Sequence, residues 1–188
     1  MKKIKNCFIL KWILLLLFSP SIAFTQEIEW QNTIGGSGND KLYTMQQTAD
    51  KGFILGGYSD SNISGDKTEN RKQGEDYWIL KTDSLGNIQW QNTIGGDRSD
   101  VLLSIQQTTD KGYILGGYSN SDGIFDKSEH SIGPNQYSDY WIVKTDSVGN
   151  ILWENTIGGY SKDELYSIVQ TTDGGYILGG VSGVIHLG

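Results

Sequence analysis

The chain is built on an internal repeat, and this repeat constrains its fold more than any other feature of the sequence. The segment Trp-Gln-Asn-Thr-Ile-Gly-Gly begins at Trp30 and at Trp90, and returns with Glu for Gln at Trp153, so the steps are 60 and 63 residues. After each copy come an aspartate, a Gln-Thr pair, a tight turn and an Ile-Leu-Gly-Gly segment. A pattern that returns in register at this period predicts stacked copies of one supersecondary unit.

Each complete unit predicts four short strands, which are rich in Ile, Tyr, Trp and Thr and separated by Gly and Asp turns. In the first complete copy these strands span residues 42–48, 53–58, 77–82 and 88–94. The pattern therefore predicts an all-β fold, an incomplete β-propeller-like array of four-stranded antiparallel blades. A β-solenoid is the alternative, although solenoid coils are usually shorter and lack two hairpin turns per unit.

The repeated residues resemble a known family. The unit, with its recurring Asp-Tyr-Trp-Ile-x-Lys and Gly-Asn-Ile-x-Trp segments, resembles the propeller-like repeats of secreted and surface proteins of Bacteroidetes and some archaea. The resemblance covers about 28–182, and its turns are similar to the tryptophan-docking turns of quinoprotein-type propellers. It implies a structural docking role between blades for Trp30, Trp90 and Trp153, and it carries over no quinone cofactor. Trp78 and Trp141 are expected in the inter-blade core.

The number of blades falls short of a closed ring. After a leader, residues 24–188 predict one repeat domain with repeats at about 30–89, 90–152 and 153–182, the last one truncated. Residues 28–34 are expected to supply the last strand of a blade, ahead of two full blades and a final pair of strands. Propellers need about four to eight blades. The sequence therefore predicts a fragment of a larger propeller, or alternatively a partial propeller that self-associates through its open blade edges.

Residues 1–23 predict a secretory signal peptide. A basic start precedes an apolar stretch, and Ser21-Ile22-Ala23 provides small residues for cleavage after Ala23, with a site near Thr25 as the alternative. An uncleaved anchor is disfavoured because the apolar run at 12–18 is too short to span a bilayer. A lipoprotein is disfavoured because Cys7 precedes that run. The mature chain is therefore expected to be extracellular, on the cell surface or periplasmic, without membrane insertion.

Charge and composition exclude several functions. Beyond residue 23 the chain has 11 basic and 22 acidic residues, a net charge of −11, which disfavours nucleic acid as a partner. Cys7 is the only cysteine, and the histidines are His130 and His186, so neither a disulfide nor a cysteine metal site is expected in the mature chain. No carboxylate or histidine stands out from the repeat as an active-site residue. The sequence thus favours a non-enzymatic protein.

One loop has the beginning of a calcium-binding pattern. Asp60, Asn62, Ser64 and Asp66 place oxygen-bearing side chains at alternating positions, with a glycine at the sixth. The twelfth position is Arg71 instead of the bidentate glutamate, and a solvated turn is the favoured alternative. No other cofactor is expected.

Two short segments, Asp83-Ser84-Leu85 and Asp146-Ser147-Val148, resemble the Asp-Ser-aliphatic acceptor of general O-glycosylation in Bacteroidetes. Ser84 and Ser147 are therefore possible glycosylation sites on exposed turns. A turn in which the aspartate caps backbone N–H groups is the structural alternative.

The sequence therefore predicts a secreted or cell-surface, non-enzymatic repeat protein that acts as a binding or structural module for an unknown protein or glycan. Its tyrosines and tryptophans could stack on sugar rings, although core positions between blades are favoured for Tyr58, Tyr118, Trp78 and Trp141. The alternative is an accessory repeat region of an exported glycan-processing enzyme. The coding sequence downstream of residue 188 distinguishes the two.

The leader gives the first testable prediction. Export should remove residues 1–23, because the basic start, apolar core and Ser-Ile-Ala end match the requirements of a signal peptidase. Intact-mass spectrometry of the exported protein measures this, and a mature protein that still contains Met1 would contradict it.

Overall fold

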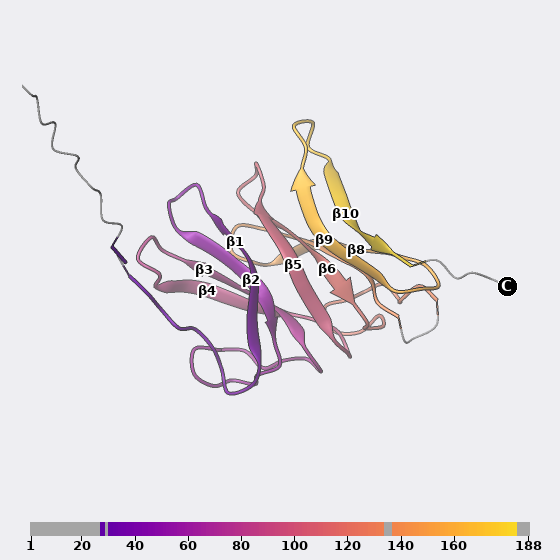
Figure 1. The fold of residues 1–188 in the computed structure, drawn as a ribbon, viewed down its shortest axis with the longest axis horizontal. Helices are drawn as coiled ribbons and strands as arrows, with labels where there is room; N and C mark the ends of the chain where they lie inside the picture. Colours follow the sequence, from indigo (N-terminus) through magenta and orange to yellow (C-terminus); the bar gives the residue numbers. More distant parts are fainter. Residues whose placement is uncertain (1–26, 29, 134–136, 184–188) are drawn as a thin grey trace, which may run out of the picture.

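The computed structural model describes residues 27–28, 30–133 and 137–183, and the predicted leader lies outside them. The described chain is all-β, with ten strands (Figure 1). The strands are β1 (Asp40–Gln47), β2 (Phe53–Ser59), β3 (Asp76–Thr82), β4 (Ile88–Ile94), β5 (Asp100–Gln107), β6 (Tyr113–Ser119), β7 (Asp139–Thr145), β8 (Ile151–Ile157), β9 (Asp163–Gln170) and β10 (Tyr176–Ser182). No described helix is long and apolar enough to cross a bilayer.

The strands form three antiparallel sheets in the order of the chain. β1–β4 and β5–β8 are two four-stranded meanders, and β9 and β10 pair as a two-stranded sheet. The prediction of an all-β chain with repeated four-stranded antiparallel sheets is confirmed. Figure 1 shows the sheets following one another from one side of the molecule to the other, and the described part does not close into a ring.

Tight turns join the first and second strands of each sheet. In the first turn, Oδ1 of Asp50 accepts hydrogen bonds from the Thr48 hydroxyl at 2.5 Å and from the Gly52 N–H at 3.1 Å. Lys51 then has a φ of 70°, in the left-handed region, and glycine takes that position in the third copy as Gly174. The aspartate thus holds a lysine in a conformation that glycine adopts readily.

The core lies between the sheets. Leu102 on β5 is fully buried, and it packs so closely on Gly56 of β2 that a Cβ there would come within 2.5 Å of its methyl group. Leu165 on β9 packs in the same way on Gly116 of β6. Both faces of β3 and β7 are buried, which explains their continuous Tyr-Trp-Ile runs.

The expected strand at 28–34 is absent: residues 30–36 have no strand pairing in the described structure. The segment still occupies the position of a fourth strand, because Asn32 Nδ2 donates to the Gly86 carbonyl at 3.4 Å just as Asn92 Nδ2 donates to Gly149 at 2.8 Å. A fourth strand pairs with the third strand of its own sheet, and the described chain has no such partner for this segment. In the described chain, the motif therefore makes its docking contact but no strand-to-strand hydrogen bonds.

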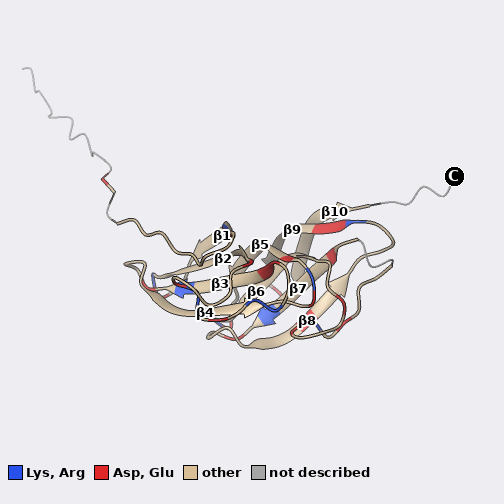
Figure 2. Cartoon of the chain, turned by 90° about the horizontal axis from the view of Figure 1, so that it is seen from below, with Lys and Arg blue, Asp and Glu red and all other residues tan. Residues whose placement is uncertain are grey.

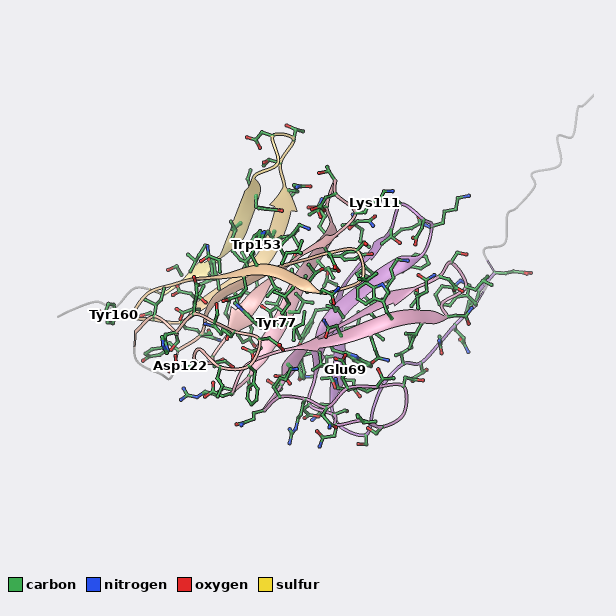
Figure 3. The ribbon with its side chains drawn as sticks, turned by 180° about the vertical axis from the view of Figure 1, so that it is seen from behind. Glu69, Tyr77, Lys111, Asp122, Trp153 and Tyr160 are labelled. Atoms are coloured by element: carbon green, nitrogen blue, oxygen red, sulfur yellow. The ribbon has the colours of Figure 1, made fainter. Side chains whose placement is uncertain are left out.

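The hydroxyl of Tyr77 lies at the junction between the first two sheets and allows their stacking to be tested. Tyr77 is fully buried between the first two sheets (Figure 3), and its hydroxyl donates to the Trp141 carbonyl at 3.0 Å. Tyr77→Phe should lower the free energy of unfolding by about 1 kcal/mol, because it removes this hydrogen bond with little change in shape.

Tyr140→Phe is the matched control. Tyr140 is the equivalent residue at the second junction, where the third sheet, within the described residues, has no third strand to supply the equivalent of Trp141. Urea denaturation of both variants measures the difference. Equal losses would show that the Tyr77 contact contributes nothing specific.

Candidate functional site

The segment that leads into each sheet is held by an aspartate at the start of the first strand of that sheet. Oδ2 of this residue accepts the backbone N–H of the second glycine of the Gly-Gly pair, four residues earlier. The three N–H to Oδ2 distances are 2.7 Å for Gly36–Asp40, 2.7 Å for Gly96–Asp100 and 2.8 Å for Gly159–Asp163. The same contact therefore recurs in all three copies of the described chain.

Serines at the end of the second strand or just beyond it complete the contact at Asp40 and Asp100. The Ser59 hydroxyl donates to Oδ1 of Asp40 at 2.5 Å, and the Ser121 hydroxyl donates to Oδ2 of Asp100 at 2.9 Å. Ser59 and Ser121 are fully buried. Asp40 and Asp100 therefore each fix both the crossover before their strand and the start of the loop that follows the next strand.

A second aspartate comes from the preceding sheet. Asp76 starts β3, and its Oδ2 accepts the Lys72 N–H. The N–H of Asp100 donates to the carbonyl of the neighbouring Glu75 at 2.6 Å, so the two aspartates lie side by side across the first junction. Oδ1 of Asp76 lies against Gly95, where a Cβ would come within 2.0 Å. Only glycine fits this position.

The second junction repeats this carboxyl pair with Asp139 and Asp163. Oδ2 of Asp139 accepts the Ile132 N–H at 2.7 Å, and the Asp163 N–H donates to the Ser138 carbonyl at 2.7 Å. All four aspartates are at most 1% exposed. The junction pairs are therefore built into the stacking of the sheets.

Burial changes the acidity of these groups. It raises the pKa of Asp76 to about 7, and the charge of Asp100 adds to the rise while Lys67 and Lys72 oppose it. Burial also raises the pKa of Asp100 to about 6, against hydrogen bonds from Ser119, Gly96 and Ser121. Burial and the charge of Asp163 raise the pKa of Asp139. Asp76 and Asp100 lie side by side, so the first junction binds protons more tightly than two separate carboxyls would.

Two buried lysines, Lys67 and Lys127, lie near the same end of the sheets and were not among the residues predicted from the sequence. Nζ of Lys67 donates to the Thr93 hydroxyl and lies 5.3 Å from the centre of the Trp78 ring. Nζ of Lys127 donates to the Thr156 hydroxyl at 2.8 Å. Burial lowers the pKa of both lysines. The recurring Asp-Lys pair at 66–67 and 126–127 is the sequence pattern that could have identified them.

The calcium candidates serve the first crossover. Asp60 accepts the N–H of Asn39 at 2.6 Å and its side-chain amide at 2.8 Å, while Asp66 accepts the Gly35 N–H at 3.1 Å. The Ser64 hydroxyl donates to the Asn62 carbonyl at 2.9 Å. These contacts are typical of a hydrogen-bonded turn. Within the described ranges, no three acidic, His or Cys side chains form a group suited to a metal ion.

The candidate docking tryptophans contact the following sheet at its turn. The Trp90 ring lies against Gly149, and its centre is 5.7 Å from that of Tyr113. Trp30 makes the equivalent contact with Phe53 at 6.0 Å, and Trp153 with Tyr176 at 5.8 Å. Trp90 is half-buried, and Trp30 and Trp153 are 41% and 40% exposed. Trp30 and Trp153 belong to the two ends of the described stack, whereas Trp90 lies between two four-stranded sheets.

The other candidate aromatic residues are less accessible. Trp78 and Trp141 are buried, and their Nε1 atoms donate to Gln91 at 2.9 Å and to Glu154 at 2.7 Å. Tyr58 is 6% exposed and Tyr118 is half-buried. These positions favour the core interpretation over sugar stacking.

The candidate glycosylation serines lie on exposed turns. Ser84 and Ser147 are both exposed, and the preceding aspartates cap the turns: Oδ1 of Asp83 accepts the Leu85 N–H at 2.8 Å, and Oδ1 of Asp146 accepts the Val148 N–H at 2.9 Å. The structural role of the aspartates leaves both hydroxyls accessible. Modification of these serines stays a prediction.

A cleft lies at the turn end of the first junction. It has a volume of about 350 Å³ and is lined by polar and aromatic side chains that include Asp50, Lys81, Trp90, Lys111 and Tyr113. Lys81 is held by Asp50 at 2.8 Å. Figure 3 shows Lys111 at this outer end of the molecule.

Comparison with known proteins adds no assignment. The chain matches no family model, and no curated protein matches it.

The junction carboxyls predict an unusual pH dependence. The free energy of unfolding should rise by about 1–3 kcal/mol as the pH falls from 8 to 5, because Asp76 and Asp100 bind protons more tightly in the folded chain than in the unfolded one. Asp76→Asn imitates the protonated side chain and should flatten this rise. Urea denaturation at each pH measures it.

Asp83→Asn is the control. Asp83 lies on an exposed turn, and hydrogen bonds from Asn87 lower its pKa, so it stays ionised throughout this range. A wild-type stability that does not change between pH 8 and 5, or that falls toward pH 5, would contradict the role given to the junction pairs.

Proposed function

We propose that the chain is an exported, non-enzymatic repeat module, a propeller-like array that acts as a structural or binding element. The observation that carries this proposal is the repetition of one junction. Leu102 on Gly56 and Leu165 on Gly116 are the same contact, made one period apart. A chain built from one repeated interface grows by adding sheets, which is the property of a scaffold.

The use of the recurring acids also supports this proposal. Asp40, Asp100 and Asp163 each bind the backbone of a crossover, and Asp50 and Asp110 each hold a turn and a lysine. These side chains therefore have structural roles. Figure 2 shows the charged residues of the described chain distributed over strand ends and loops.

A binding role would use the surface between neighbouring blades. The cleft at the first junction combines the half-buried Trp90 with Lys111, Asp50 and Gln107. Aromatic faces beside polar side chains suit a glycan or a polar peptide segment. These features support a protein or a glycan as the partner in the binding role.

The modular scaffold is tested by adding one period. A copy of residues 120–182 placed after Ser182 continues the strand register, because Ser182 is the equivalent of Ser119. The extended chain should have a higher urea midpoint and a steeper urea dependence, because it gains a complete junction and buries more surface.

The same addition with Leu165→Asp in the added copy is the control. It has the same length and lacks the buried leucine of the new junction, so it should lose most of the gain. If the extended chain is no more stable than the original, the sheets do not stack as repeated equivalent units.

A further inference from the structure

The first strand of the first sheet presents side chains that are buried in the other copies. Leu42 and Met45 on β1 are 52% and 61% exposed. Their equivalents on β5, Leu102 and Ile105, are 0% and 6% exposed, and those on β9 are buried equally well. The difference arises because β5 and β9 each have a preceding sheet to pack on. β1 therefore exposes the side chains, here called the knob, that in the other two copies pack on the preceding sheet.

The opposite end of the stack presents the receiving half. Gly56 and Gly116 each accept a leucine from the next sheet, whereas the equivalent Gly179 on β10 has open space around it, with nothing within 4 Å of an added Cβ. Ile177 beside it is 64% exposed, while the equivalent Ile54 and Ile114 are fully buried. β10 therefore displays an unused copy of the receiving surface.

The two surfaces lie at opposite ends of the molecule and cannot meet within one chain (Figure 1). We propose that a second copy of the chain docks head to tail, with Leu42 and Met45 of one copy packed on Gly179 and Ile177 of the other. This inference rests on the proposed repeat module, because it uses the internal junction as its template. The interface is heterologous, so association can continue beyond a dimer.

The polar register of the junction supports the same docking. The N–H of Ile105 donates to the Thr44 hydroxyl at 3.3 Å, and the N–H of Ile168 donates to the Ser104 hydroxyl at 3.2 Å. In the docked pair, the N–H of Met45 would meet the hydroxyl of Ser167, the next residue in this series. The backbone donor and the side-chain acceptor are therefore both present in the chain.

One contact of the template is missing, and this sets the strength of the association. Gln46 and Gln106 accept the N–H groups of Gln107 at 2.6 Å and of Gln170 at 2.7 Å across the two junctions. Val169 stands at the corresponding position on β9 and has no acceptor. The third sheet also lacks a third strand in the described chain. The docked interface is consequently weaker than the internal junctions, and association should be reversible and depend on concentration.

The β1 face also has space for a neighbouring sheet. A hollow of about 310 Å³, lined by Leu42, Leu55, Gly56, Leu80 and other residues, lies between this sheet and the segment 30–36. Ile54, the equivalent of Ile177, packs in the same core cluster as Leu102 and Ile105. Ile177 of the neighbouring copy would fill part of the hollow in the same way. The acidic charge of both copies opposes their approach, so salt should strengthen association.

Sedimentation velocity of the purified protein over a range of concentrations and salt tests the proposal. The wild type should associate increasingly with concentration and with salt. Gly179→Val fills the receiving surface, and Leu42→Ser removes the knob. Each variant alone should associate at least about tenfold more weakly, because a buried leucine contact is lost. Val148→Ser, on an exposed turn of the middle sheet, should behave as the wild type.

Mixing the two variants gives the decisive result. Gly179→Val keeps an intact β1 face and Leu42→Ser keeps an intact β10 face, so a mixture should form a one-to-one heterodimer that stops at two chains. A wild type that is monomeric at every concentration would overturn the proposal and leave these faces to further repeats or another protein. Association that both variants leave unchanged, or that mixing does not restore, would also overturn it. Because the added-period variant is measured separately, failure here is distinguishable from failure of the repeat module.

Discussion

The hydrogen bond from the second glycine of each crossover to the aspartate four residues later is the interaction on which the rest of the structure depends. It sets the point at which the chain leaves the fourth strand of one sheet and enters the first strand of the next. In doing so it fixes the offset between sheets, and this offset places Leu102 over Gly56 and Leu165 over Gly116. The second aspartate of each junction, and Ser121 at the first junction, then pack around this bond. Stacking and polar network are therefore parts of one arrangement.

The fold was predictable where the repeat and the turn chemistry agree. The strand at Ile88–Ile94 was predicted with its exact limits, and the other strands of its sheet differ from their predicted limits by one or two residues, because Asp-Lys-Gly and Gly-Asn turns bound them. The strand at 28–34 was wrong for a physical reason: a local motif specifies a docking contact, but a strand also needs a partner. A repeated motif therefore predicts where a segment lies better than it predicts whether that segment pairs as a strand.

The site was less predictable than the fold. Asp76 and Lys67 lie in or beside polar segments, and polar segments between strands are ordinarily solvated. Asp76 is covered by the next sheet, where it meets Asp100, and Lys67 is covered by Thr93 and Trp78 of its own sheet. The composition of the segment itself carries no information about burial by residues distant in the sequence. The Asp-Lys and Asp-Tyr-Trp repetitions were visible, but repetition alone does not distinguish a buried charge from a surface one.

The loop between the second and third strands of each sheet differs in length between the two complete copies, whereas the turns at the opposite end are the same length. The three additional residues of the second copy come before Asp139 begins its strand. The junction beyond it keeps the Gly N–H to aspartate contact and the aspartate N–H to backbone carbonyl contact of the first. Each four-stranded sheet therefore has a loop of variable length between its second and third strands, and turns of constant length at its opposite end. An engineer who wished to display a foreign peptide on this chain would insert it in this variable loop. Insertions in successive sheets would then lie in a row at the spacing of the sheets.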